Sequence, residues 1–491
     1  MKTPLSEKIS QLIHKASKRQ IITLLVVTAL VLANGYAIIR EVPAIQLLTV
    51  AVLGLYLLFF HADWVMYLIA LSTPFSVIIS SKDIHLGLSL PSEALMITLT
   101  MVFFARILYD LSIRREFLRH PVSIAIFVYL GWMLVTCMTS VRPVVSFKFF
   151  ASKVWFITSC YWFFLQLVED DLKNVVRYFN CYALGLTVIV FITIYKHSLS
   201  GFDEHYAHWV MTPFYNDHTA YGAALAFMLP LTVGFFFLED NKLYHKIFYA
   251  VISVILLLAF YLSFSRAAWI SLVAAIGVLV ILKLRIKLSW LVGGGLVLGL
   301  FLFFYADDIL YKMSRNSQDS SGDFVEHIQS MSNISTDASN MERLNRWTAA
   351  FSMIQEKPVF GWGPGTYQFE YAPFQRGYYR TIISTDFGDG GNAHSEYIGP
   401  CAESGIPGMI TVFVLVFVFL YYGITTYIYA EDKTLKLMSL CATLSLITYF
   451  AHGVFNNFLD TDKLSVLVWA GFAVVTVCNV KMKAESSQIV D

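Results

Sequence analysis

The sequence predicts an all-α polytopic integral membrane protein with about 12–14 transmembrane helices and one large outer loop. Of its 491 residues, 57% are hydrophobic and only 14% are charged, whereas soluble domains average about 25% charged residues. The apolar residues form successive runs, each about long enough to cross a hydrocarbon core of roughly 30 Å. One long polar interruption, residues 306–395, separates the last three runs from the others.

Apolar runs bounded by charged residues predict the individual spans. They lie near 20–39, 44–60, 64–80, 92–109, 121–139, 149–168, 178–195, 219–238, 247–265, 267–282, 288–305, 406–427, 437–456 and 464–480. Several are short or share a boundary, which gives the range of about twelve to fourteen. Backbone groups in lipid must be hydrogen-bonded within the segment, so these runs favour helices; a barrel would show alternating strands of about ten residues.

The spans divide the chain into three parts: N-terminal transmembrane helices (1–305), a large outer loop (306–395) and C-terminal transmembrane helices (396–491). The basic residues of the N-terminal segment share one side of the membrane with most of the basic clusters in the short loops, at positions 15, 18, 19, 114, 115, 119, 283, 285, 287, 433, 436, 481 and 483. Because short cytoplasmic loops carry the excess of basic residues, both termini are predicted to be cytoplasmic. The large loop then lies on the outer face, which is the periplasm in a Gram-negative cell.

Composition also excludes some partners and cofactors. The net charge is +1, and we expect no nucleic-acid partner because that would need a basic stripe. None of the six cysteines forms a Cys-x-x-Cys pair, so neither a zinc site nor a disulfide framework is expected. His205 and His208 resemble a metal-site fragment but lack the His-Glu-x-x-His arrangement, so we expect no metal there. Asp386 and Asp389 are interpreted as turn residues.

The large loop is predicted to contain one amphipathic helix. Residues 306–340 are rich in Ser, Asp and Asn and are expected to be weakly ordered. A Ser-x-x-Glu capping box at 339–342 then predicts a helix that stops before Lys357 and Pro358. Its residues Arg343, Arg346 and Trp347 share one face and could grip a phosphate and stack on a sugar. The alternative is a solvated surface helix whose Trp lies at the bilayer interface.

A glycine-rich turn and a histidine follow this helix. The sequence FGWGPG at 360–365 predicts a tight turn in which glycines allow close backbone approach. It is not a nucleotide loop, because no Gly-Lys-Ser/Thr follows. His394 comes after the flexible sequence FGDGGNA, which could act as a lid. Its imidazole could take a proton from a hydroxyl near neutral pH; a capping or merely exposed His is the alternative.

Other polar residues lie at outer helix ends. Arg266 is a functional candidate because a charge at a membrane-embedded position is costly unless paired or solvated; snorkelling is the alternative. Snorkelling would equally explain Arg142 and Lys153, which are candidates for substrate binding. His452, Asn456 and Asp460 are spaced four apart, a pattern that is usually structural.

Three stretches together resemble the bacterial O-antigen ligase and O-antigen polymerase superfamily. They are SRA at 265–267, Arg343 and Trp347 followed by PVFGWGPGTY, and HSEYI at 394–398 leading to ESGIPG at 403–408. Their order and their placement around the loop match the family, and the resemblance covers about residues 120–460. The departures are Ser395, where Asn is common, and more spans than the usual twelve.

The resemblance implies a metal-independent, inverting glycosyltransferase of the bacterial inner (plasma) membrane. It would move a glycan from undecaprenyl diphosphate to a hydroxyl of lipid A-core, of a growing polysaccharide repeat, or of a protein. On that pattern His394 deprotonates the acceptor, and Arg266 with Arg343 neutralises the diphosphate. Arg346, Trp347, Lys153, Arg142 and Asp460 would bind substrates, with Asp460 also a candidate for orienting His394. No cofactor is implied.

Two other classes of protein compete with this hypothesis. A transporter or flippase of lipid-linked glycan would place charges in mid-membrane and show inverted repeats with broken helices. Here the ionisable groups gather at outer helix ends, and no repeat is apparent. A sensor or scaffold would usually carry a soluble signalling domain. Ligase and polymerase are not separated by the sequence.

Overall fold

The computed structural model describes residues 61–81, 86–109, 113–238, 242–286, 338–377 and 391–490, together with the isolated positions Thr28, Arg380 and Ser384. Its internal contacts divide the chain into residues 1–65 and 66–491, and the account below concerns the second unit. The spans predicted near 20–39, 44–60 and 288–305 lie outside the described residues, as do the polar stretch 306–337 and the segment 385–390.

Eight helices in the described part are long and apolar enough to cross a membrane. They are α7 (Pro121–Met138), α10 (Lys173–Ser198), α12 (His218–Phe236), α13 (Leu243–Tyr261), α14 (Arg266–Lys283), α19 (Ile398–Tyr429), α20 (Lys433–His452) and α21 (Asp462–Val490). Each overlaps a predicted span, and the all-α polytopic fold class is confirmed. Helix α5 (Ser92–Tyr109) matches another predicted span.

Two predicted spans have a different local structure. Near 64–80, helix α4 (Ala62–Ser72) ends early and leads into η1 (Thr73–Phe75) and strand β1 (Val77–Ser81), because Pro74 lacks an amide hydrogen and disfavours helix at the residue before it. Strand β1 pairs antiparallel with β2 (Leu86–Leu90), and Val77 lies opposite Leu90. Near 149–168, α8 (Pro143–Ile157), the π-helical segment η2 (Thr158–Phe163) and α9 (Phe164–Asp170) follow one another without a break.

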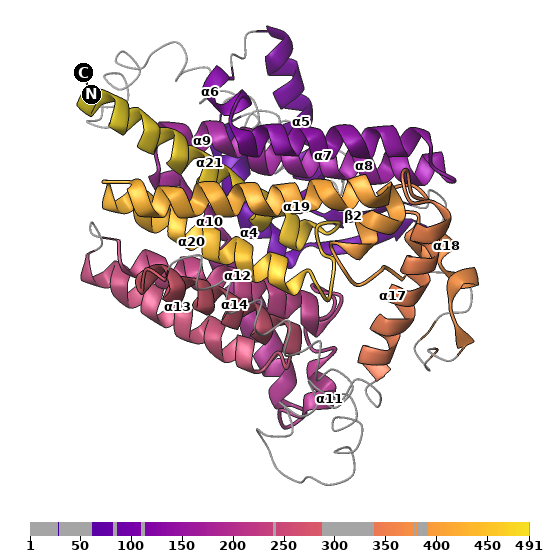
Figure 1. The fold of residues 1–491 in the computed structure, drawn as a ribbon. Coiled ribbons are helices and arrows are strands. Elements are labelled where there is room, and N and C mark those ends of the chain that lie inside the picture. The colour runs from indigo at the N-terminus through magenta and orange to yellow at the C-terminus, as the bar shows by residue number, and fades with distance from the viewer. Residues whose placement is uncertain are drawn as a thin grey trace, which may run out of the picture. The chain divides into compact units, whose positions relative to one another are not determined.

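Helices α20 and α21, together with α12, form most of the interior of the second unit. Helix α21 is almost wholly buried and packs against α19, α20, η2 and α9, while α20 also packs against α12 and α14 (Figure 1). Trp469 is fully buried on α21. Only 28% of α13 and 22% of α14 are buried inside the protein, as expected for helices whose apolar faces meet lipid.

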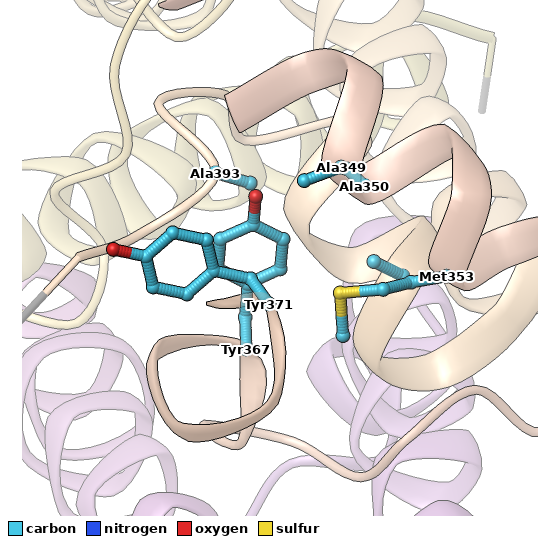
Figure 2. Close-up of a cluster of buried hydrophobic side chains, with 7 residues drawn as sticks. Ala349, Ala350, Met353, Tyr367, Tyr371 and Ala393 are labelled. Atoms are coloured by element: carbon cyan, nitrogen blue, oxygen red, sulfur yellow. The ribbon is translucent and has the colours of Figure 1, made fainter. Parts of the chain in front are cut away.

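The large loop folds against the start of α19. Helix α17 (Ala338–Glu356) ends where the Lys-Pro pair predicted. Figure 2 shows its residues Ala349, Ala350 and Met353 packed with Tyr367 and Tyr371. These two tyrosines belong to α18 (Tyr367–Glu370) and the residue after it, and their rings stack with centroids 5.3 Å apart. A short η4 (Ala372–Phe374) follows, while α6 (Arg115–Leu118) and α11 (Glu204–Ala207) lie in other loops.

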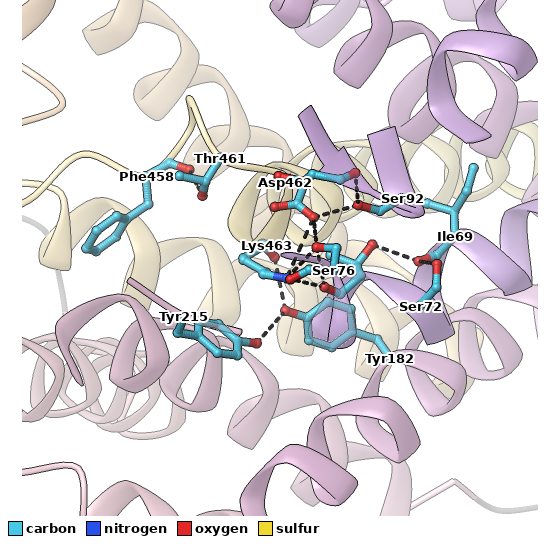
Figure 3. Close-up of polar contacts among 12 residues, drawn as sticks. Ile69, Ser72, Ser76, Ser92, Tyr182, Tyr215, Phe458, Thr461, Asp462 and Lys463 are labelled. Carbon is cyan, nitrogen blue, oxygen red and sulfur yellow. Dashed lines mark hydrogen bonds and ion pairs between the residues drawn. The ribbon is translucent and has the colours of Figure 1, made fainter. Parts of the chain in front are cut away.

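A buried polar network joins the first residue of α21 to η1 and α5. Ser76 Oγ donates to Asp462 Oδ2 and accepts from Lys463 Nζ, and Ser92 Oγ donates to the same Asp462 oxygen at 2.6 Å (Figure 3). Lys463 Nζ also donates to the carbonyl oxygens of Thr73 and Ser76. Because these groups are buried and mutually satisfied, the network fixes the point where the chain enters α21.

Candidate functional site

One cavity of about 570 Å³ opens between the large loop, the C-terminal half of α7, α8 and the N-terminal part of α19. This volume is within the usual range for ligand pockets. The cavity is lined by Tyr129, Trp132, Met133, Phe149, Lys153, Asn216, Asp217, Arg346, Pro364, Gly365, Tyr367, Gln368, Gly391, Asn392, Ala393, His394, Glu396, Gly399, Pro400, Glu403, Ser404, Gly408, Thr411, Asn457, Phe458, Asp460 and Thr461. It therefore combines aromatic walls with ionisable groups of both signs.

His394 is held in an uncommon backbone conformation at the cavity wall. Its φ is +47°, which a residue other than glycine rarely adopts, and its amide donates to Asn392 Oδ1 at 3.1 Å. Two residues later Glu396 N donates to Gly453 O at 2.7 Å, which fixes the segment from the other side. Burial lowers the pKa of His394 to about 4, and the charges of Arg343 and Arg346 act in the same direction. The imidazole is therefore neutral at physiological pH.

Arg346 points its guanidinium toward the same cavity. Its Nε donates to Glu342 Oε1 at 2.6 Å and its guanidinium carbon lies 4.3 Å from the Tyr371 ring centroid. The side chain is only 4% exposed, and its Nη1 has no hydrogen-bond partner among the described residues. A Cβ at Gly391 would occupy the position of that guanidinium. The absence of a side chain at Gly391 thus leaves room for the Arg346 guanidinium, whose Nη1 could donate a hydrogen bond to a ligand.

Glu342 holds Arg346 in place. Burial raises the pKa of Glu342, but hydrogen bonds from Ser384 and Arg346 and the charge of Arg346 outweigh burial, so that pKa lies below its usual value. Glu342 therefore stays ionised and fixes the guanidinium by a charge-assisted bond.

The predicted glycine turn closes another side of the cavity. Trp362 N donates to Ala402 O at 3.1 Å and Gly363 N to Glu403 O at 2.7 Å, so the turn packs against the second turn of α19. Gly361 has φ +66°, and a Cβ there would clash with the Glu403 backbone. Close backbone approach at this turn, as the sequence predicted, is confirmed.

The segment between α20 and α21 supplies the remaining wall. Glu396 Oε1 accepts from Phe458 N at 2.7 Å, from Leu459 N at 2.9 Å and from the Tyr449 hydroxyl. Lys153 Nζ donates to Leu459 O. These contacts bring Asp460 into the cavity, where it is exposed to the interior space. Enclosure by protein raises the pKa of Asp460 to about 6, partly offset by the charge of Lys153.

Arg266 and Arg343 lie beside the cavity rather than in its lining. Arg266 is the first residue of α14, and its charge acts on His208 and His218, whose rings are 4.0 Å apart between centroids. Arg343 Nε donates to Phe455 O at 3.4 Å, and its charge acts on both His218 and His394. Arg266, Arg343 and Arg346 therefore form a basic band that leads from the N-terminus of α14 to the cavity. The N-terminus of a helix is itself a favourable place for an anion.

The other sequence candidates lie at various distances from this chemistry. Trp347 stacks on Phe455 with centroids 6.5 Å apart and does not line the cavity. Arg142 forms an exposed ion pair with Glu370 at 2.5 Å. His452 ends α20 and is fully buried with both ring nitrogens unpartnered among the described residues; Asn456 and Asp460 lie beyond the helix end, not on it.

Three acidic residues of the cavity were not singled out from the sequence. Asp217 Oδ1 accepts from the amides of Thr219 and Ala220 at 2.8 Å, and its charge acts on His394. Glu403 Oε1 accepts from Tyr367 N at 3.0 Å. Glu396 holds the wall described above. The N-cap pattern Asp-His-Thr at 217–219 was a detectable signal for Asp217, whereas nothing local marks the long-range partners of the two glutamates.

The described residues hold no group of three His, Cys, Asp or Glu side chains arranged to bind a metal ion. The six cysteines are unpaired, and five of them are buried.

Residues 251–413 match the family model described as O-antigen ligase. This match makes the region from the middle of α13 to the middle of α19 similar to O-antigen ligases. The matched domain contains Arg266, Arg343, Arg346 and His394, whereas Lys153 and Asp460 come from outside it. A comparison with curated proteins gives no match. The family implies a lipid-linked glycan and an acceptor as substrates in a membrane, and a glycosyltransferase-like enzyme.

Proposed function

We propose that this protein transfers a glycan from undecaprenyl diphosphate to an acceptor hydroxyl at the outer face of the bacterial inner membrane, as an O-antigen ligase does with lipid A-core. The observation that carries the proposal is that one cavity contains a neutral imidazole, His394, and a buried guanidinium, Arg346, whose Nη1 has no hydrogen-bond partner among the described residues. Glycosyl transfer from a diphosphate needs both a base and a cationic stabiliser.

In the proposed step, the acceptor oxygen attacks the anomeric carbon from the side opposite the diphosphate. The new bond forms between that carbon and the acceptor oxygen, while the bond from the carbon to the diphosphate oxygen breaks. The acceptor proton passes to His394, and the bonding electron pair leaves with the diphosphate. This single displacement inverts the anomeric configuration and involves no oxidation or reduction.

The basic band supports the assignment of the leaving-group end. The diphosphate gains negative charge as it departs, and fixed guanidinium groups in a poorly hydrated site stabilise that charge strongly. Arg266, Arg343 and Arg346 supply three such groups around His218 and His394. Since guanidinium groups neutralise the leaving group, we propose that the reaction is metal-independent.

Purified protein in nanodiscs, given an undecaprenyl-diphosphate-linked glycan and candidate acceptors, provides the test by mass spectrometry of the products. We expect transfer by the parent protein and by His205→Ala, the control, because His205 is exposed and does not line the cavity. His394→Ala should abolish transfer while donor binding is kept, because the diphosphate contacts belong to the arginines.

Transfer at the parent rate by His394→Ala would disprove the base. Loss of activity with EDTA that a divalent ion restores would replace this mechanism by a metal-assisted one and direct attention to His205 and His208. Arg266→Lys should be nearly as harmful as Arg266→Ala, with a loss of roughly 10²-fold or more, because an ammonium cannot reproduce the bidentate fork.

A further inference from the structure

The cavity has two chemically different ends. His394 and Arg346 line one, and the charges that act on His394 are those of Arg343, Arg346, Asp217 and Glu342. Glu396, Glu403 and Asp460 line the other together with Lys153, and the charge of Lys153 interacts with all three carboxylates. The second end therefore places one ammonium among three acids, which leaves an excess of negative charge there.

The three carboxylates differ in their remaining capacity to bind a ligand. Glu396 Oε1 already accepts three hydrogen bonds from the protein, and Glu403 Oε1 accepts one from Tyr367. Asp460 is exposed to the cavity, and among the described residues no side chain donates a hydrogen bond to it. Lys153 is 3% exposed and directs its Nζ to the Leu459 carbonyl. Asp460 is thus the carboxylate available to a ligand.

Aromatic side chains surround this acidic end. Tyr129 lines the cavity together with Trp132, Phe149 and Phe458. The charges of all three carboxylates act on the Tyr129 hydroxyl. The indole of Trp132 is fixed, because its Nε1 donates to Ser404 O at 2.8 Å and its ring stacks on Phe360. Fixed aromatic faces beside carboxylates suit a sugar, whose C–H face packs on a ring while its hydroxyls donate to the acids.

The anionic diphosphate of the donor fits the cavity end that is lined by His394 and Arg346. Arg346 is nine-tenths buried, and its Nη1 is unpartnered among the described residues, so an anion bound there would complete its hydrogen bonding. A diphosphate beside Asp460, Glu396 and Glu403 would instead meet like charges. The acidic end is therefore left for the second substrate.

We propose that the acidic end binds the acceptor as an uncharged or amino-bearing sugar, and that Asp460 excludes acceptor sugars that carry a carboxylate or phosphate near the reacting hydroxyl. This inference rests on the proposed function for the role of that sugar as acceptor. The carboxylate discriminates in two ways: it accepts a hydroxyl or ammonium proton from the favoured sugar, and it repels an anionic one.

The test compares methyl β-glucoside, methyl β-glucosaminide and methyl β-glucuronide, of which only the last carries a carboxylate. Binding to the full-length protein in nanodiscs is measured by tryptophan fluorescence and by saturation-transfer NMR without donor. We expect the glucoside and glucosaminide to bind at least about 10-fold more tightly than the glucuronide, because like charges brought together at a binding site are strongly disfavoured.

Asp460→Asn keeps the size of the side chain and removes its charge. In this variant the glucoside should bind less than about 3-fold more tightly than the glucuronide, since the main charge that repels the glucuronide is gone. The matched control Asp170→Asn removes an exposed carboxylate that does not line the cavity, and it should keep the parent preference. Unchanged size-exclusion profiles and melting temperatures establish that both variants are folded.

Equal or tighter binding of the glucuronide by the parent protein overturns the inference, as does an unaltered preference in Asp460→Asn or an absence of binding by all three sugars. A separate transfer assay with the natural donor distinguishes the two proposals. Charge-selective binding without any transfer would remove the proposed function and retain the sugar site. Transfer to neutral and anionic acceptors at equal rates would remove the sugar selectivity and retain the function.

Discussion

Glu396 accepts a hydrogen bond of 2.7 Å from the backbone amide of Phe458, which ties the segment that carries His394 to the segment that carries Asp460. The same oxygen accepts from Leu459 N, and Glu396 N donates to Gly453 O. A single buried residue thereby sets the spacing between the proposed base and the acidic wall.

Glu396→Ala should lower both stability and activity. It leaves two backbone amides and the Tyr449 hydroxyl unpartnered in a buried place, and each orphaned group costs on the order of 1–3 kcal/mol. Glu396→Gln should lose less, because the amide oxygen still accepts from Phe458 and Leu459. Thermal unfolding in detergent checks the order parent, Gln, Ala, with Glu431→Ala as the control because Glu431 is exposed. Equal melting temperatures for the Ala and Gln variants would contradict the role of this acceptor.

The pH profile should show His394 as a group that is neutral over the physiological range. Burial and the nearby arginines lower the pKa of His394 to about 4. A neutral imidazole accepts the acceptor proton and a protonated one does not, so kcat at saturating acceptor should fall as the pH drops through about 4. The measurement is the rate of product formation from pH 3.5 to 8.

Arg343→Ala should move this acid limb toward higher pH. It removes a positive charge that disfavours protonation of His394, although burial keeps the pKa below the ordinary value of about 6.5. Arg376→Ala, at an exposed loop position, should leave the limb in place. An acid limb that stays near 6.5 in the parent, or that moves downward in Arg343→Ala, would refute the assignment.

His394 and Arg346, which local motifs proposed, both line the cavity. The Lys-Pro stop predicted where α17 ends, whereas the helix already begins at Ala338, one residue before the predicted cap at Ser339. The sequence also placed Arg343 on the same face as Arg346, yet positions three apart differ by about 60° around a helix. In the structure this difference turns Arg346 to the cavity, while Arg343 and Trp347 face Phe455.

Long-range partners could not be predicted from one sequence. Glu396 and Glu403 each lie within a quoted motif, but their partners Phe458 and Tyr367 are set by how α17, α19 and α20 pack. From the sequence alone, proton transfer to His394 was expected near neutral pH, because the burial and neighbouring charges that lower its pKa exist only in the folded chain. The early end of α4 was missed because hydropathy continues through Thr73 and Pro74 into strand β1.

Gly391→Ala should displace Arg346 without disturbing the fold. A Cβ at this position would overlap the Arg346 guanidinium, which must then leave its place beside Tyr371. We expect transfer to fall roughly 10²-fold, the scale for loss of one preorganised charge stabiliser. Gly377→Ala is the matched control, because a Cβ there meets no atom within 4 Å. Equal transfer rates for the two alanine variants would show that Arg346 has no part in the reaction.

Lys463→Met should destabilise the protein through the buried network at the start of α21. The ammonium donates to Thr73 O, Ser76 O and Ser76 Oγ, and Ser76 in turn donates to Asp462 (Figure 3). Removal of one partner from a buried ionic group lowers the free energy of unfolding by on the order of 3–5 kcal/mol, because it leaves the other charge uncompensated.

Asp462→Asn should cost a comparable amount of stability. The double variant should cost clearly less than the two single variants together, because neither charge then remains. A double-mutant cycle of unfolding free energies in detergent measures this coupling. Strictly additive losses would show that Lys463 and Asp462 stabilise the entry to α21 independently.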